Sequence, residues 1–427
     1  MTEAFLQYVW QHQMLGKRLT TTEGQPVDVI RPGELNKDAG PDFFNARVRV
    51  GEVEWVGNIE LHLHTSDWKA HHHSQDKAYN NIILHVVYEH DCEITLENGK
   101  RPVTVELRHF MHPSLVQNYE SLTAPVTDDS VPCARRLPQV PSFVVNSFLE
   151  RLTVERIESK SQVVRRLLDE SHGSWEQTCY WLLAHYFGGK VNALPFELLA
   201  KATDQRLLAR WKDNPVRLES LLMGQAGLLE ENFADDFPRR LQTDYEALRG
   251  GAALEPIAKY IWRFHCLRPS SFPTIRISQF ANLVSRSSSL FATLLGITDV
   301  AEMEKLFACQ ASDYWNNHYQ FDRVTQRSSV KRIGRMQADS LIINAWVPLL
   351  FVYGEVHGQQ QYKEQAISLL QQLPAENNSI IRRWQSAGVA PENAAQSQAL
   401  LQLNANYCGG RRCLDCRIGY NIIKTTK

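Results

Sequence analysis

Residue types that bind metal ions or transfer protons are concentrated between Gly33 and Asp91. Within 59–64, the polar residues Glu60, His62 and His64 alternate with aliphatic ones. Because successive side chains of a β-strand point to opposite faces, we expect these three polar groups on one face. Carboxylates and imidazoles that share a face can bind a divalent ion or act as acid and base in hydrolysis.

A β-hairpin predicted before this strand brings a second carboxylate to the same face. If its strands turn about Gly51, Asp42 lies opposite Glu60. Two carboxylates so close together repel each other unless a cation or a proton lies between them. A two-residue turn would instead place Phe43 opposite Glu60, unless a bulge at Gly57 restores the register. The sequence leaves both pairings open.

These residues resemble the PD-(D/E)XK nuclease superfamily. Pro41-Asp42 matches its PD, and Glu60-Leu61-His62 matches its (D/E)XK with histidine in the lysine position. Glu34 resembles its upstream helical acid. The segment 75–79 fits the Q-x-x-x-Y motif of the RecB-like branch. The resemblance covers about the first quarter of the chain and implies a small, mixed-sheet, restriction-endonuclease-like domain.

The resemblance also implies a function, that of a metal-dependent phosphodiesterase acting on DNA or RNA. Asp42 and Glu60 would hold magnesium or manganese, and His62 would bind the ion or orient and deprotonate the attacking water. The supporting residues would be Glu34, Gln75 and Tyr79. The alternative is a catalytically inactive relative that keeps the fold as a binding or scaffold module, because imidazole lacks the fixed positive charge of lysine.

The histidines support a third reading, a zinc-dependent hydrolase of a small substrate. His62 and His64 on the strand, with His71, His72 and His73 just beyond it, supply enough imidazoles for three ligands and an open position. His85, within an apolar segment, is interpreted as a core histidine.

The elements that must position these residues are predicted from hydrophobic periodicity. A helix over 68–81 is expected to cross over to an apolar strand, 82–88, which then runs parallel to the strand ending at His64. On that helix His72, Asp76 and Tyr79 would share a face. A further hairpin is predicted across Asn98-Gly99.

Beyond residues 121–141, which are rich in Pro, Asp and Ser, the periodicity becomes helical. We therefore expect an α+β protein, in which a small α/β domain (1–125) precedes a larger all-α domain (126–400). A cysteine-containing segment (401–427) is expected to pack on the helical domain.

Three of the eight cysteines are clustered, namely Cys408, Cys413 and Cys416, in the pattern C-x4-C-x2-C. This spacing is typical of structural zinc and iron–sulfur sites, with Cys309 or His318 as the fourth ligand. Some RecB-like nucleases hold an iron–sulfur cluster through three clustered cysteines and a distant one. The alternative is that these cysteines are free thiols. The remaining cysteines are interpreted as isolated buried thiols: Cys92, Cys133, Cys179, Cys266 and Cys309.

Charge and hydropathy restrict the function further. The 427 residues include 46 Lys and Arg against 47 Asp and Glu, which argues against a protein that coats nucleic acid. Arginine pairs together with aromatics such as Trp262 and Trp315 could line a nucleic-acid groove. The alternative is that the arginines lie on solvated helix surfaces and the aromatics lie in the core. The apolar run 341–353 is shorter than the roughly 20 residues of a membrane span. No signal-peptide pattern is visible, so we expect a cytoplasmic protein that does not enter membranes. The whole chain is similar to an uncharacterised bacterial family known as a domain of unknown function.

Overall fold

The computed structural model describes residues 1–427 except 17, 126–129, 251–253, 266, 288 and 426–427. Cys266 thus lies outside the described residues. The chain forms two compact units. The first contains Met1–Phe148, Arg382–Ala390 and Leu403–Lys427, and the second contains Leu149–Ile381 and Pro391–Gln402.

The first unit is built on a mixed sheet in the order β1-β2-β4-β5-β6-β7, with β3 paired to β4. Pairing is antiparallel as far as β5 and parallel from β5 to β7. The Thr22 N–H donates to the Thr104 carbonyl at 3.0 Å, so the sheet nearly closes into a barrel. The strands are β1 (Leu19–Thr20), β2 (Pro26–Arg31), β3 (Glu34–Leu35), β4 (Phe43–Val50), β5 (Val53–His64), β6 (Ile82–Glu89) and β7 (Thr104–Glu106). The predicted mixed sheet, with an apolar parallel strand in its interior, is confirmed.

The crossover between β5 and β6 is not the single helix predicted over 68–81. It consists of one helical turn, α2 (Asp67–Ala70), and two 3₁₀ turns, η1 (His73–Gln75) and η2 (Lys77–Tyr79). His72 interrupts it with φ +61°, and Asp76 is extended. The expected shared helical face of His72, Asp76 and Tyr79 is therefore wrong, because a left-handed residue ends the α-helical hydrogen bonding.

The hairpin predicted across Asn98-Gly99 is also wrong. A turn forms there, in which the Leu96 N–H donates to the Lys100 carbonyl at 2.8 Å. The segment before it is not a strand, and β7 pairs in parallel with β6. Ile94 and Leu96 are instead buried against Trp68 of the crossover, so burial rather than strand pairing fixes this segment.

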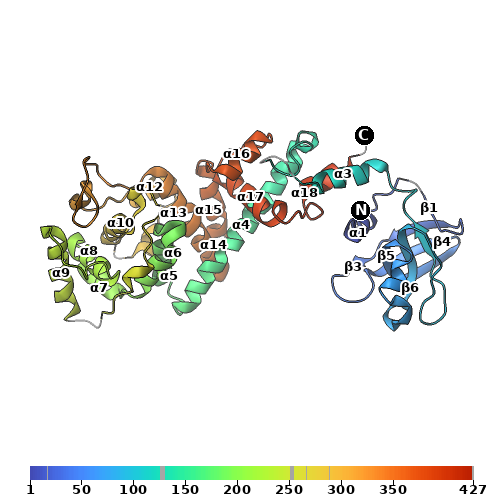
Figure 1. Ribbon diagram of the computed structural model, residues 1–427, viewed down its shortest axis with the longest axis horizontal. Helices are drawn as coiled ribbons and strands as arrows, with labels where there is room; N and C mark the ends of the chain where they lie inside the picture. The colour runs from blue at the N-terminus through green and yellow to red at the C-terminus, as the bar shows by residue number, and fades with distance from the viewer. Residues whose placement is uncertain (17, 126–129, 251–253, 266, 288, 426–427) are drawn as a thin grey trace. The chain divides into compact units, whose positions relative to one another are not determined.

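The first unit also contains segments from both ends of the chain. Helix α1 (Glu3–Gln11) lies against β5. Helix α3 (Pro113–Thr123) contacts α18 (Arg417–Lys424) near the C-terminus (Figure 1). Asn118 joins these helices, because its side-chain amide donates to the carbonyls of Ile422 and Thr425 at 3.0 and 2.9 Å. We expected 401–427 to pack on the helical domain, whereas the structure groups 403–427 with the first unit.

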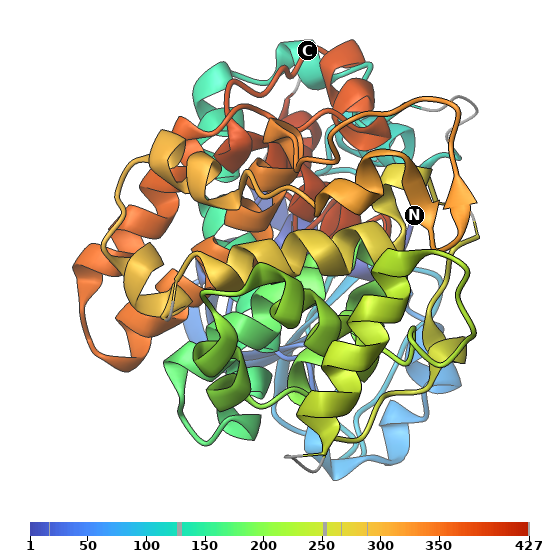
Figure 2. The same cartoon turned by 90° about the vertical axis from the view of Figure 1, so that its left-hand side faces the viewer.

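The second unit is largely helical, as predicted. Its described sheet content is the two-stranded ribbon of β8 (His318–Gln320) and β9 (Arg323–Val324). Helices α8, α9 and α10 pack together on the side that faces the viewer in Figure 2. Helix α4 begins in the first unit, and helices α16 and α17 end in it. The helices are α4 (Ser142–Glu170), α5 (Trp175–Phe187), α6 (Gly189–Lys201), α7 (Gln205–Trp211), α8 (Pro215–Gln225), α9 (Asp236–Arg249), α10 (Pro273–Ser285), α11 (Leu290–Leu295), α12 (Val300–Phe307), α13 (Arg335–Leu341), α14 (Val347–Val356), α15 (Gln360–Gln372), α16 (Ser379–Ser386) and α17 (Ala394–Leu403).

One helical run, Arg335–Val356, is long and apolar enough to cross a membrane. Its most apolar window is 72% buried inside the protein, which is usual for a core helix. Its length and composition are therefore weak evidence for a membrane span.

Candidate metal centre

The register of the hairpin decides which residues reach the site. Val50 pairs with Val53 and Ala46 pairs with Gly57, which is the pairing of a two-residue turn. The register then shifts by one residue, so that Phe43 pairs with Ile59. Asn45, with φ +56°, lies at this irregularity. Of the two predicted pairings the two-residue turn is therefore correct, but the bulge that restores the register lies at Asn45 and not at Gly57.

Because of this bulge, Asp42 lies beside Glu60. The Asp42 N–H donates to Glu60 Oε2 at 3.0 Å, and the Leu61 N–H donates to Asp42 Oδ2 at 2.9 Å. The other oxygen, Oδ1, accepts a hydrogen bond from Gln7 at 2.8 Å. Burial, together with the nearby charge of Glu60, raises the pKa of Asp42 to about 7. Asp42 can therefore hold or release a proton near neutral pH.

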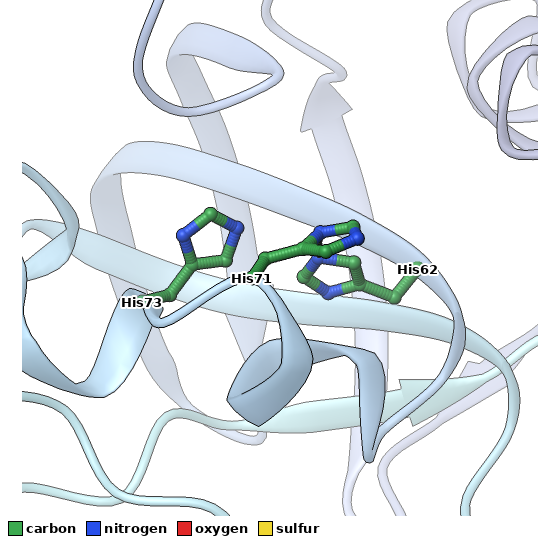
Figure 3. Close-up of side chains that lie close together, drawn as sticks. All are labelled: His62, His71 and His73. Atoms are coloured by element: carbon green, nitrogen blue, oxygen red, sulfur yellow. Dashed lines mark hydrogen bonds between the residues drawn. The ribbon is translucent and has the colours of Figure 1, made fainter.

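Three histidines converge next to this pair. His62 comes from β5, while His71 and His73 come from the crossover on either side of the left-handed His72 (Figure 3). One ring nitrogen from each lies within 4.8 Å of the other two. His62 Nε2 is 3.2 Å from His71 Nδ1. Three ring nitrogens this close together could hold one metal ion between them.

The electrostatic environment keeps the buried imidazoles neutral. Burial, together with the neighbouring His73 and His71, lowers the pKa of His62 to about 3. Burial and the nearby His62 also lower the pKa of His85 well below its usual value. A neutral imidazole retains a lone pair, which is the form that binds metal ions.

His85 fixes how His62 presents that lone pair. His62 Nδ1 is 2.9 Å from His85 Nε2, and among the described residues the buried Nδ1 of His85 has no partner. If His62 binds a metal through Nε2, its Nδ1–H donates to His85 Nε2, and the proton of His85 lies on Nδ1. His85, which the sequence suggested to be a core histidine, is thus a candidate positioning residue.

Glu60 contributes an oxygen to the same place. Its Oε1 lies 3.2 Å from His73 Nε2 and 3.7 Å from His62 Nε2, and its side chain is 6% exposed. Tyr79 stacks on His73 with ring centroids 3.8 Å apart, and Trp68 contacts His62 and His73 edge-on. Three imidazoles suit zinc or a similar transition ion, with the Glu60 carboxylate beside them, whereas magnesium prefers oxygen ligands.

The structure brings some predicted residues together and separates others. Asp42, Glu60, His62 and Tyr79 meet, with His71 and His73. Glu34 does not join them, because it lies in β3 rather than in a helix, and it is exposed and ion-paired with Arg31. Three further predicted residues lie outside the site and are exposed, namely His64, His72 and Gln75. His64 faces Asp67.

Helix α1 supplies two polar residues that sequence reasoning missed. Gln7 binds Asp42, and Glu3 faces the histidines. Burial raises the pKa of Glu3, which His71 partly opposes. Residues four apart share a helix face, and this spacing was the available signal. Trp262 and Trp315, considered for a nucleic-acid groove, are buried in the core of the second unit.

Together these features define an α+β protein whose nearly closed mixed sheet carries a histidine-rich candidate metal centre. The chain belongs to the family described as "Protein of unknown function (DUF2851)", whose model matches residues 3–379. No curated protein and no solved structure matches the chain. The resemblance to the PD-(D/E)XK superfamily therefore rests on the motifs alone.

Proposed function

We propose that this protein is a metal-dependent hydrolase whose ion is bound by His62, His71 and His73. The observation that carries the proposal is the approach of three imidazole nitrogens to within 4.8 Å of one another. They belong to two separate elements and lie beside a buried carboxylate. Three protein ligands leave a coordination position open, as in catalytic rather than structural zinc sites.

The proposed roles follow from the hydrogen bonds. A bound ion of this type would activate water and polarise a substrate oxygen. Glu60 would orient that water and accept its proton, because Oε1 faces the histidines while Oε2 is held by the Asp42 N–H. Asp42, with a pKa of about 7, would supply or take up the second proton.

In this proposal the histidines bind the ion, which therefore does not occupy the magnesium or manganese site expected at Asp42 and Glu60. Both oxygens of Asp42 already accept hydrogen bonds from the protein, and one oxygen of Glu60 does so too. Nitrogen ligands favour a transition ion. Asp42 would therefore act through Glu60 rather than bind the ion.

A phosphodiester is the substrate class that we propose to test first. An acidic pair on adjacent strands, followed by a crossover to a parallel strand, is what a restriction-endonuclease-like domain would require. The motifs at Asp42 and Glu60 carry that resemblance. A phosphodiesterase of this kind would have nucleic acid as its partner. The alternative is a catalytically inactive scaffold with the same fold.

A pair of adjacent substitutions tests the metal centre. His71→Asn removes a proposed ligand, whereas His72→Asn changes an exposed neighbour to a residue that tolerates its left-handed backbone. We expect His71→Asn to weaken zinc binding at least about tenfold and to abolish hydrolysis, with His72→Asn close to wild type. Zinc affinity would be measured by calorimetry, and activity on a chromogenic phosphodiester and on labelled DNA and RNA.

Equal zinc affinity in the two variants would overturn the metal centre. Zinc binding without hydrolysis of any of these substrates would favour the scaffold.

A further inference from the structure

A second group of metal-binding side chains lies in the first unit, in a cavity separate from the histidines. Its wall contains four cysteines that come from three places in the chain. Cys133 precedes η3 (Leu137–Gln139), Cys408 ends η8 (Asn404–Cys408), and Cys413 and Cys416 lie just before α18. The rest of the wall is largely apolar and includes Leu122, Trp384, Tyr407, Ile418 and Gly419.

The four thiols influence one another. Burial, together with neighbouring thiols, raises the pKa of Cys133 to about 12 and that of Cys416 to about 11. The pKa of Cys408 is raised in the same way, by burial and then by the other three thiols. All seven described cysteines are free, so no disulfide accounts for this grouping.

The surroundings suit thiolates once a cation compensates their charge. The backbone N–H groups of Ile418 and Gly419 donate to the sulfur of Cys416. Burial raises the pKa of Cys408 and Cys413, and the positive charge of Arg411 partly opposes that rise. Hydrogen bonds to sulfur and nearby positive charge are features of thiolate-bound metal sites.

The backbone is also shaped around the sulfurs. A Cβ atom at position 419 would overlap the carbonyl oxygen of Cys413, so only glycine fits there. Arg411 has φ +53°, a conformation that few non-glycine residues adopt. Its N–H donates to the Cys408 carbonyl at 3.2 Å. The turn from Cys408 to Cys416 is therefore held in one conformation that directs three thiols into the cavity.

We infer that Cys133, Cys408, Cys413 and Cys416 together bind one metal centre, with Cys133 as the fourth ligand. The residues first considered for that position lie in the second unit. Cys309 donates to the Leu306 carbonyl, and His318 stacks on Tyr314. Cys133 had been interpreted as an isolated buried thiol, but it shares the cavity wall with the other three.

The spread of the sulfurs favours an iron–sulfur cluster over a single zinc ion. Tetrahedral zinc, with Zn–S bonds of about 2.3 Å, requires sulfurs about 3.8 Å apart. Across the part of the chain that the structure describes, only the histidines bring three ligand atoms within 4.8 Å of one another. The thiols are therefore more widely spaced than one zinc ion needs, which is the reason to test first for a cluster of several irons.

The test is metal and sulfide analysis of the full chain purified without oxygen, with visible absorption spectra. We expect about four irons and four sulfides per chain. Cys133→Ser should lose most of the iron and the colour. Cys92→Ser, a half-buried thiol of the same unit outside the cavity, should keep both.

One zinc per chain that Cys133→Ser releases would support the four-thiolate site but overturn the cluster. If the wild type contained neither iron nor zinc, the proposed site would be overturned. An iron content per chain that is the same in Cys133→Ser as in the wild type would overturn it too. Wild-type protein provides a second measurement if the variant does not fold. Four additional thiols should react with a thiol reagent after metal is stripped, and an unchanged number of reactive thiols would contradict the proposal.

Discussion

The histidine cluster and the four-cysteine cavity occupy the same unit, but they are assembled differently. The histidines come from one strand and the crossover that follows it, and they border two carboxylates, with His71 exposed. The cysteines join a segment after α3 to one near the C-terminus, inside a mostly apolar wall. The first arrangement has one ligand exposed to solvent, whereas the second places its ligands in a mostly apolar cavity wall. The two centres should therefore differ in what they support, which is reaction in the first and stability in the second.

The largest effect is expected at Glu60. In Glu60→Gln the carboxylate that faces the histidines loses its basicity, while the size of the side chain is kept. We expect kcat to fall about 10²- to 10⁴-fold with zinc still bound. Glu54→Gln, on the exposed part of the same strand, is the matched control. Activity that survives Glu60→Gln would remove the base from the proposed mechanism.

Gly419→Ala should separate the two centres. The added Cβ overlaps the Cys413 carbonyl, so the turn must shift, at a cost of about 1–3 kcal/mol in the free energy of unfolding. We expect lower iron content and a lower Tm, with phosphodiester hydrolysis per folded molecule unchanged. Gly410→Ala, which meets no backbone atom closely, serves as the control. Unchanged iron content and Tm in Gly419→Ala would contradict this account of the turn.

A change at His85 tests positioning rather than ligation. His85→Phe fills the space but leaves the Nδ1–H of His62 without an acceptor, so zinc affinity should fall about 10- to 100-fold. His85→Gln retains an acceptor oxygen and should recover part of the affinity. Titration of zinc into each purified variant measures both values. Equal losses in the two variants would reduce His85 to a packing role.

The smallest effect on stability is expected when a chelator removes the histidine-bound zinc at neutral pH. A chelator should remove zinc from the histidines and abolish activity with little change in Tm, because hydrogen bonds of the sheet already hold β5 in place. Loss of the cysteine-bound metal should lower Tm, since it releases a link between distant segments. Thermal melts recorded alongside metal analysis distinguish these events. A large fall in Tm on removing only the histidine-bound zinc would contradict the proposed difference between the two centres.

The sequence predicted those parts of the fold and site that depend on local pattern. Alternating polar residues placed Glu60 and His62 on one strand face, and the apolar run 82–88 formed an interior strand. The sequence predicted the bulge at Gly57 instead of Asn45, because several residues of the hairpin could have accommodated the one-residue shift in register. The crossover was mistaken for a helix because the backbone angle of His72 leaves no signal in hydrophobic periodicity.

The cysteine cavity was only partly predictable for a different reason. The spacing of Cys408, Cys413 and Cys416 is local and was recognised. The neighbourhood of Cys133 depends on where α3 meets α18, a contact between residues more than two hundred positions apart. No residue near Cys133 distinguishes it from the other isolated cysteines, so its partners emerge only in the folded chain.

The composition of the first unit has a consequence for biosynthesis. Residues 403–427 belong to it, yet the whole of the second unit is translated before them. The sheet with its histidines can form early on the ribosome, because all its strands lie within the first 106 residues. The cysteine cavity must wait until residues 403–416 have followed the whole helical unit out of the ribosome. Any metal bound there would be inserted into a chain whose helical unit has already had time to fold.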